Sequence, residues 1–143
     1  LRIKCWPKPG DYCLDMGSCP GGWTYVLEKL KAKTLSVDRS PLAEPLRNSP
    51  LVENRLMDAF KLDPSDVNKI DWFFSDLICY PDKLLELVNR WLEFHPQANY
   101  ICTIKFQGKT DFAALEKFRS IPGSQIFHLN ANKHEITWLR ILK

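Results

Sequence analysis

The chain has 143 residues, a formal net charge of +3 at pH 7, 45% hydrophobic residues and 26% charged residues. Its length suits one domain that buries a core without disulfides or a metal ion, and its aromatic content argues against disorder. No apolar run is long enough to span a bilayer, so we expect no membrane partner. The five cysteines include no C-x-x-C pair, which favours reduced thiols in a cytoplasmic protein over a zinc or redox site.

Short apolar runs alternate with amphipathic stretches along the chain. Apolar runs between turn residues predict strands, which we place at residues 12–14, 35–37, 51–56, 72–74, 100–104, 125–129 and 136–141. Apolar residues at helical spacing predict helices over 23–30, 84–92 and 112–118, the last of them capped by Thr110. Pro41 is expected to open a further, short helix that ends at Leu46.

The alternation of strands and helices with short connections predicts an α/β fold whose sheet is mostly parallel, with helices on both faces. The last two predicted strands have no helix between them, so the final strand is expected to run antiparallel. No repeat, low-complexity tract or internal linker divides the sequence, and we therefore expect a single domain over residues 1–143.

Charged residues follow the predicted strands. Ligands of open α/β sheets bind beyond the carboxyl ends of the strands, so the residues at these ends are the first candidates for a site. They are Asp15, Asp38, Asp58, Asp76 and Lys105. Because a buried charge must be paired or functional, this set predicts a ligand site rich in carboxylates. The alternative is that individual aspartates cap helices or turns.

A glycine-rich loop follows the first predicted strand, with Gly17, Gly21 and Gly22 between Asp15 and Trp23. Glycine lets the backbone turn sharply and approach a ligand closely, and the helix that follows can direct its first N–H groups to the same place. The spacing is not G-x-G-x-x-G, which argues against a dinucleotide. At the next strand ends, a carboxylate at 38 suits the hydroxyls of a ribose, and one at 58 suits an exocyclic amine such as that of adenine.

Residues Asp15 to Trp23, D-M-G-S-C-P-G-G-W, resemble the D-L-G-x-x-P-G-G-W signature of the FtsJ-like RNA ribose 2′-O-methyltransferases. The resemblance covers about residues 5–142 and continues in order through Val37-Asp38, Asp58-Ala59-Phe60, Asp71-Trp72, Ser75-Asp76-Leu77, Ile104-Lys105 and His134-Glu135-Ile136-Thr137. It implies the Rossmann-like fold of methyltransferases that depend on S-adenosylmethionine (SAM), with a seven-stranded sheet. It also implies an enzyme that methylates a ribose 2′-hydroxyl of RNA, with ribosomal RNA as the expected substrate.

The resemblance assigns roles to individual residues. For the methionine end of SAM it implies contacts from Gly17, Cys19, Pro20, Gly21, Gly22 and Trp23. It implies that Asp38 holds the ribose of the cofactor, Asp58 the adenine, and that Asp76 lies near the sulfonium. The implied catalytic residues are Lys105, Asp76 and Glu135. A lysine acts as a base only when it is neutral, and a carboxylate favours its charged form, so we expect Asp76 to orient Lys105.

Two lysines beside predicted strand ends, Lys109 and Lys133, are the expected contacts to RNA phosphates. The family's lysine upstream of its first motif has no counterpart, because Lys8 aligns instead with the loop before the first strand. We therefore expect a piece of a longer protein that lacks an upstream helix and an RNA-binding region and acts as a monomer. The histidines at 95, 128 and 134 are scattered, so no metal site is predicted.

Two other classes of function remain open at this point. A SAM methyltransferase that acts on a protein or a small molecule would share the glycine-rich loop, but would not need Lys105 and Glu135 around its acceptor. A non-catalytic module that binds SAM or RNA would be consistent with the missing upstream lysine.

Overall fold

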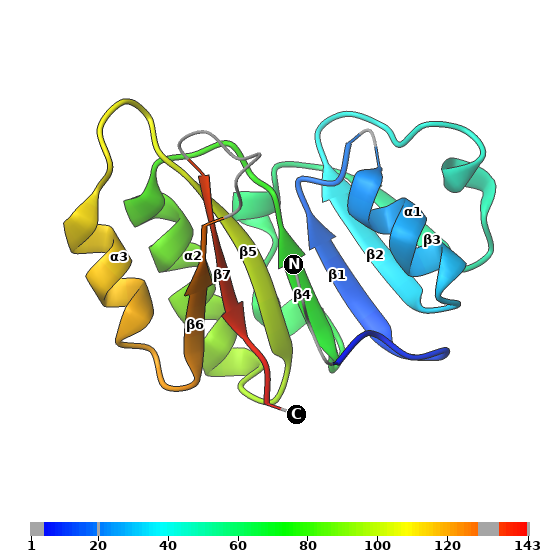
Figure 1. Ribbon diagram of the computed structural model, residues 1–143. Coiled ribbons are helices and arrows are strands. Elements are labelled where there is room, and N and C mark those ends of the chain that lie inside the picture. The colour runs from blue at the N-terminus through cyan, green and yellow to red at the C-terminus, as the bar shows by residue number, and fades with distance from the viewer. Residues whose placement is uncertain (1–4, 20, 129–134, 143) are drawn as a thin grey trace.

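The described residues, 5–19, 21–128 and 135–142, form a seven-stranded sheet in the order β3-β2-β1-β4-β5-β7-β6 in a computed structural model (Figure 1). Its strands are β1 (Tyr12–Met16), β2 (Lys33–Asp38), β3 (Val52–Leu56), β4 (Trp72–Ser75), β5 (Asn99–Lys105), β6 (Ser124–Phe127) and β7 (Glu135–Arg140). The strands from β1 to β5 pair in parallel, whereas β7 is antiparallel to both of its neighbours. The predicted mostly parallel sheet with an antiparallel last strand is confirmed.

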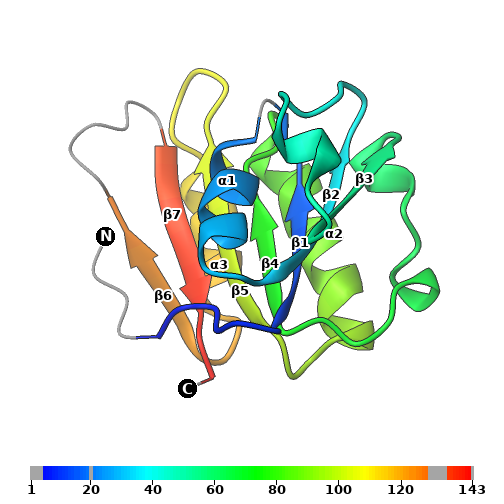
Figure 2. The same ribbon diagram turned by 90° about the vertical axis from the view of Figure 1, so that its right-hand side faces the viewer.

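Helices cover both faces of the sheet. The α-helices are α1 (Gly22–Lys29), α2 (Pro81–Phe94) and α3 (Phe112–Arg119), and short 3-10 helices lie at η1 (Leu46–Asn48), η2 (Ala59–Lys61) and η3 (Pro64–Asp66). Helix α1 packs on one face, while α2 and α3 lie side by side on the other (Figures 1 and 2). This arrangement confirms the predicted placement of helices on both faces.

Strand β4 lies near the middle of the sheet and is buried on both faces. Phe74 faces the α1 side, where its cluster includes Leu27, and Phe73 faces the α2 side, where its ring lies 5.5 Å from that of Trp91. Such burial on both sides is typical of a central parallel strand and explains why it reads as a continuous aromatic run. The core therefore fixes β4, and with it the position of Asp76 directly after the strand.

Two local predictions are wrong. Residues 41–45 are not helical, and a 3-10 helix covers Leu46–Asn48 instead. A helix begun at Pro41 would place Pro45 where an intrahelical N–H is required, and proline has none. Helix α3 is capped not by Thr110 but by Asp111, whose Oδ1 accepts from the Ala114 N–H at 3.0 Å. A carboxylate is the stronger acceptor of the two neighbouring caps.

No helix within the described residues is long and apolar enough to cross a membrane. The described cysteines carry free thiols.

We expect Phe73→Ala to lower the free energy of unfolding by about 3–5 kcal/mol, because a fully buried ring leaves a cavity in the core. Phe112→Ala is the matched control, since Phe112 is 73% exposed and Phe73 is 0% exposed. The control should stay within about 0.5 kcal/mol of the wild type in urea unfolding followed by circular dichroism. Equal losses in the two variants would contradict this account of the core.

Candidate active site

The carboxyl ends of three neighbouring strands are tied together by backbone hydrogen bonds. The N–H of Gly17 donates to the Val37 carbonyl oxygen of β2 at 2.8 Å, and that of Asp76 donates to the Met16 carbonyl oxygen of β1 at 3.2 Å. Gly17 has a φ of +77°, and a Cβ there would lie 2.9 Å from Leu77 Cδ2. A glycine is therefore required where the chain leaves β1. Asp15 itself lies inside β1, not beyond its end.

A cavity of about 450 Å³ opens between the loop after β1, the start of α1 and the end of β4. It is lined by Asp15, Gly17, Ser18, Cys19, Gly22, Trp23, Val26 and Asp76. The predicted methionine-end residues Gly17, Cys19, Gly22 and Trp23 thus lie around one space. Gly21 is buried at the N-cap of α1, and Pro20 lies outside the described residues. Among the described lining residues the charged groups are two carboxylates, so the cavity suits a cationic group.

Asp15 is 1% exposed and is the most deeply buried charged group of this cavity. Its Oδ2 accepts from the Thr24 hydroxyl at 2.7 Å, whereas its Oδ1 finds no hydrogen-bond partner among the described residues. Burial raises the pKa of the Asp15 carboxyl to about 7; the bond from Thr24 opposes this rise, and the charge of Asp76 adds to it. An unpartnered buried carboxylate oxygen on a cavity wall calls for an outside donor.

A second cavity, of about 320 Å³, lies beyond the ends of β2 and β3 and shares Gly17 with the first. It is lined by Gly17, Asp38, Arg39, Asp58, Ala59, Phe60, Leu77, Ile78 and Lys83. The two aspartates predicted to hold the ribose and the adenine of a nucleoside therefore face the same space. Gly17 lines both cavities, so they are neighbours at the carboxyl ends of the strands, and each of them is lined by carboxylates.

Both of these aspartates also make local bonds. Asp38 accepts from the Cys19 N–H through Oδ2 and from the Ser40 N–H through Oδ1, each at 3.0 Å. Asp58 caps η2, and the Arg39 guanidinium, 2.8 Å from its Oδ2, is the main reason why the pKa of this carboxyl is lowered. The capping alternative is thus realised in both residues. It does not exclude ligand contacts, because each carboxylate oxygen can accept a further hydrogen bond.

Three predicted catalytic residues come together where β4, β5 and β7 meet. Lys105 ends β5, and its Nζ lies 3.0 Å from Asp76 Oδ1 and donates to the Asp76 carbonyl oxygen, also at 3.0 Å. Glu135 is the register partner of Lys105 across the antiparallel β5–β7 pair. The Lys105 side chain is only 17% exposed, so the ion pair is partly shielded from water. A partly buried ammonium is thereby placed between two strands that carry carboxylates.

Of the two lysines predicted to contact RNA, the structure describes only one. Lys109 is exposed in the segment that follows β5, four residues beyond Lys105. Lys133 lies outside the described residues. Among the described residues no group of three His, Cys, Asp or Glu side chains is placed to hold a metal ion.

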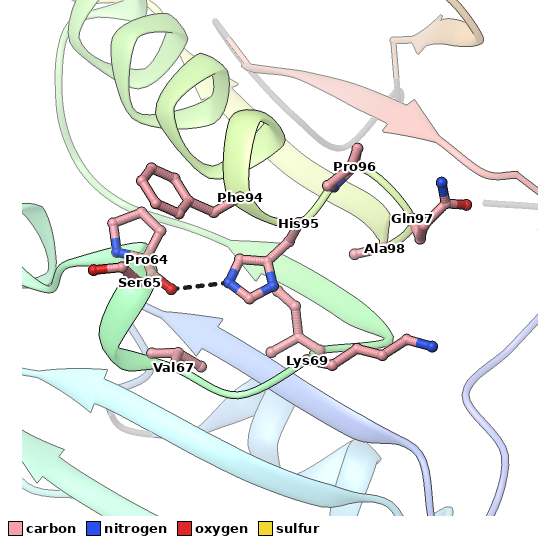
Figure 3. Close-up of a pocket in the computed structure, with 10 residues that line it drawn as sticks. Pro64, Ser65, Val67, Lys69, Phe94, His95, Pro96, Gln97 and Ala98 are labelled. Carbon is pink, nitrogen blue, oxygen red and sulfur yellow. Dashed lines mark hydrogen bonds between the residues drawn. The ribbon is translucent and has the colours of Figure 1, made fainter.

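A third cavity, of about 440 Å³, lies near the amino end of β5, away from these residues (Figure 3). The His95 imidazole, beside the end of α2, donates to the Pro64 carbonyl oxygen at 3.0 Å and so satisfies this buried ring. Pro64, Phe94 and Ala98 give the wall an apolar surface, and Lys69 contributes charge at its rim. None of the predicted site residues lines it, so the two neighbouring cavities at the other edge of the sheet are the candidate active site.

Sequence reasoning missed several residues of the site. Phe60, Leu77 and Ile78 line the second cavity, and the Lys83 ammonium lies 4.2 Å from the centre of the Phe60 ring. Their position just after strand ends was the available signal, but apolar residues in loops carry no distinctive pattern. Thr24 was also missed, although its place two residues after the glycine pair put it in the first turn of α1.

The sequence and the fold were compared with known proteins. The profile of the family described as FtsJ-like methyltransferase matches residues 2–126. The ribosomal RNA large subunit methyltransferase M of Aggregatibacter aphrophilus (strain NJ8700) is 30% identical over 96% of this chain, which spans 41% of that relative's length. That of Photorhabdus sp. (strain Az29) is 40% identical over 58% of this chain and 22% of its own length.

Solved structures give the same fold. An rRNA methylase from Streptococcus thermophilus superimposes with a TM-score of 0.67 at 18% identity, covering 95% of this chain and 89% of that one. A putative methyltransferase from Streptococcus mutans, SMU.1697c in complex with SAH, gives 0.67 at 14% identity, with 94% and 90% covered. At such identities the likeness establishes the Rossmann-like methyltransferase fold alone. Together with the family profile, which matches most of the sequence, it leads to one conclusion: the chain belongs to the FtsJ-like methyltransferase family.

Proposed function

We propose that this chain is the catalytic unit of an enzyme that transfers a methyl group from SAM to a ribose 2′-hydroxyl of ribosomal RNA. The observation that carries this proposal is the ion pair of Lys105 with Asp76, which stands beside the acidic cavity and has Glu135 in register across the sheet. The names of the relatives, ribosomal RNA large subunit methyltransferase M, support the substrate class.

The two neighbouring cavities fit the two ends of the cofactor. The first has two carboxylates, and Asp15 Oδ1 lacks a partner in the part of the chain that the structure describes, so this cavity suits the positively charged methionine end. The second, with Asp38 and Asp58, suits the adenosine. When bound, SAM supplies a methyl group on a positively charged sulfonium. The residues proposed to hold it are Gly17, Cys19, Pro20, Gly21, Gly22, Trp23, Asp38, Asp58 and Asp76.

Lys105 is proposed to position the hydroxyl that accepts the methyl group. Its ammonium has three N–H donors, of which two are directed at the Oδ1 and the carbonyl oxygen of Asp76. The third has no partner within the described residues and can donate to the 2′-oxygen of a ribose, where it stabilises the negative charge that develops as the proton leaves. Asp76 and Glu135 are the nearby carboxylates that can receive this proton. Holding the acceptor in line with the methyl group supplies much of the rate.

The RNA is proposed to reach this site past Lys109, which follows β5 and would contact a phosphate, and Lys133 is proposed as a second phosphate contact. We expect the reaction to take place in the cytoplasm, because the relatives named above are bacterial proteins. We expect the chain to act as a monomer within its full-length protein.

Asp38→Ala should weaken SAM binding by about 1.5–3 kcal/mol, because hydrogen bonds to a charged acceptor are lost. Asp63→Ala is the matched control, since Asp63 likewise accepts the N–H two residues ahead, that of Ser65 at 2.9 Å, but lies beside the third cavity. Isothermal titration calorimetry with SAM measures both affinities. Equal affinity of the Asp38 variant and the wild type would refute the cofactor assignment.

Lys105→Ala in the full-length protein should lower methyl transfer by at least about 100-fold and leave the SAM affinity within about twofold, because the lysine faces the acceptor. Lys69→Ala, at the opposite edge of the sheet, should behave as the wild type. The assay is transfer of labelled methyl from SAM to unmodified ribosomal RNA, followed by a test for resistance of the labelled nucleotide to alkaline cleavage.

Asp76→Ala should reduce both methyl transfer and SAM affinity in the same assays, because this residue lines the acidic cavity and also holds Lys105.

Full activity of the Lys105→Ala variant would show that the lysine is not catalytic. Label found on a base or on a protein would refute the ribose as acceptor.

A further inference from the structure

We infer that Thr24 is a positioning residue which, backed by Ser36, stabilises the ionised form of Asp15, that this form binds the ammonium of the cofactor, and that cofactor binding releases the proton from the Asp15 groups that still carry one. This inference rests on the proposed function for the identity of the ligand. It concerns residues to which the resemblance assigned no role, Thr24 of α1 and Ser36 of β2.

The three side chains form a short buried chain of hydrogen bonds. The Thr24 hydroxyl lies 2.7 Å from Asp15 Oδ2 and 2.6 Å from the Ser36 hydroxyl. Thr24 and Ser36 are fully buried and Asp15 is 1% exposed, so water does not compete for these contacts. The residues come from β1, α1 and β2, and the chain therefore links the three elements that surround the glycine-rich loop.

The hydrogens of this chain favour one protonation state of Asp15. Each hydroxyl has a single hydrogen, so a carboxylate at Asp15 directs Thr24 to donate to it and Ser36 to donate to Thr24. With the proton on Oδ2, Asp15 would instead donate to Thr24, and the Ser36 hydrogen would have to find another acceptor. No such acceptor for Ser36 is found in the part of the chain that the structure describes. The hydroxyl pair thus stabilises the ionised carboxylate.

The second carboxylate oxygen of Asp15, Oδ1, is the one that remains for a ligand. Oδ1 is buried and unpartnered within the described residues, while Asp15 lines the acidic cavity together with Asp76. An ammonium supplies the N–H donor and the positive charge that this oxygen lacks, whereas a neutral ligand supplies at most the donor. A protonated Oδ1 would present its own hydrogen to the ammonium and repel it. Binding therefore selects the ionised form of Asp15.

Burial and the charged groups on the neighbouring elements determine how readily Asp15 ionises. Asp76 after β4 and Asp38 at the end of β2 both disfavour a further negative charge at Asp15, and burial disfavours it most. The Cys13 thiol, two residues away on β1, is held neutral by burial, which raises its pKa. The Lys105 ammonium is paired with Asp76. The hydrogen bond from Thr24 is the contact of this chain that opposes the burial of Asp15.

The test uses S-adenosylhomocysteine, which carries the same ammonium as SAM and cannot react, in calorimetry with the wild-type protein between pH 6 and pH 7.5. Over this range the α-amino group stays mostly charged, so the change reports on the protein. With the pKa of Asp15 at about 7, the dissociation constant should be roughly eightfold larger at pH 6 than at pH 7.5. Titrations in buffers of different ionisation enthalpy should show release of most of one proton at pH 6.

Thr24→Val removes the hydroxyl and keeps the shape of the side chain. If the pKa of Asp15 rises by about one unit, binding should weaken about threefold at pH 7.5 and about ninefold at pH 6. Thr24→Ser restores the hydroxyl and should restore both values. Thr34→Val is the matched control: Thr34 is also buried in β2, and its hydroxyl has no partner within the described segments, so binding should not change.

A second measurement needs no ligand. Asp15→Asn removes the titrating group. The wild type loses the stability contributed by the protonated Asp15 carboxyl as the pH rises through about 7, whereas the variant has no such loss. The melting temperature of the variant minus that of the wild type at the same pH should therefore increase from pH 5 to pH 8. This comparison tests the titration of Asp15 in the folded protein without a ligand, and a melting-temperature difference that does not change with pH would overturn the inference.

The outcomes distinguish the inference from the proposed function. Absence of S-adenosylhomocysteine binding at every pH would overturn the cofactor assignment and the inference together. Binding whose affinity and proton release do not depend on pH, or a Thr24→Val variant that follows the wild-type pH profile, would overturn the inference alone. A pH profile displaced in Thr24→Val and restored in Thr24→Ser supports it.

Discussion

Hydrogen bonds between β1 and its two parallel neighbours hold the carboxyl ends of three strands at one edge of the sheet. The backbone bonds of Gly17 to β2 and of Asp76 to β1 extend this alignment one step beyond the strands. The Cys19 N–H then donates to the Asp38 carboxylate, which ties the glycine-rich loop to the end of β2. The candidate ligand contacts at these strand ends are therefore supported by main-chain hydrogen bonds, and the buried side chains of β4 hold the middle of the sheet in place. The site depends on the register of β1 more than on any one side chain.

The burial of Asp15 beside the site lowers the stability of the fold at neutral pH. Asp15 is buried with few compensating donors, and its raised pKa means that it stabilises the fold while protonated, below the pKa of the unfolded chain. That contribution is lost as the pH rises through about 7, where the carboxylate must be charged inside the protein. An apolar or amide side chain would fit the strand with less strain. A carboxylate at such a place is typical of a residue that serves binding at a cost in folding stability.

Much of the fold could be predicted because strand periodicity and strand-end chemistry are local properties. The aromatic run at 72–74 and the helical spacing from Leu84 to Leu92 both gave elements that the structure confirms. The prediction failed where two competing residues are adjacent, as with Thr110 and Asp111, and where Pro45 blocked a helix that Pro41 would favour. Such outcomes depend on which of two weak local preferences the tertiary context selects.

The site was predictable to the level of which strand ends it uses. The ion pair of Lys105 with Asp76 joins residues 29 positions apart, and it was expected because the family resemblance implies that both are catalytic and a carboxylate favours a charged lysine. The Arg39 contact to Asp58 and the Thr24 contact to Asp15 could not be expected, because side-chain direction in a loop or a first helical turn has no sequence periodicity.

Lys105 contacts two oxygens of the same residue, the carboxylate and the main-chain carbonyl of Asp76. A tetrahedral ammonium can reach both at once and still direct a third hydrogen elsewhere, whereas the donors of an arginine lie in one plane on a wider head. Replacement of Lys105 by arginine would therefore break this double contact with Asp76, even though the positive charge is kept. In this chain the shape of the cation at position 105, and not only its charge, therefore determines whether both oxygens of Asp76 can be contacted.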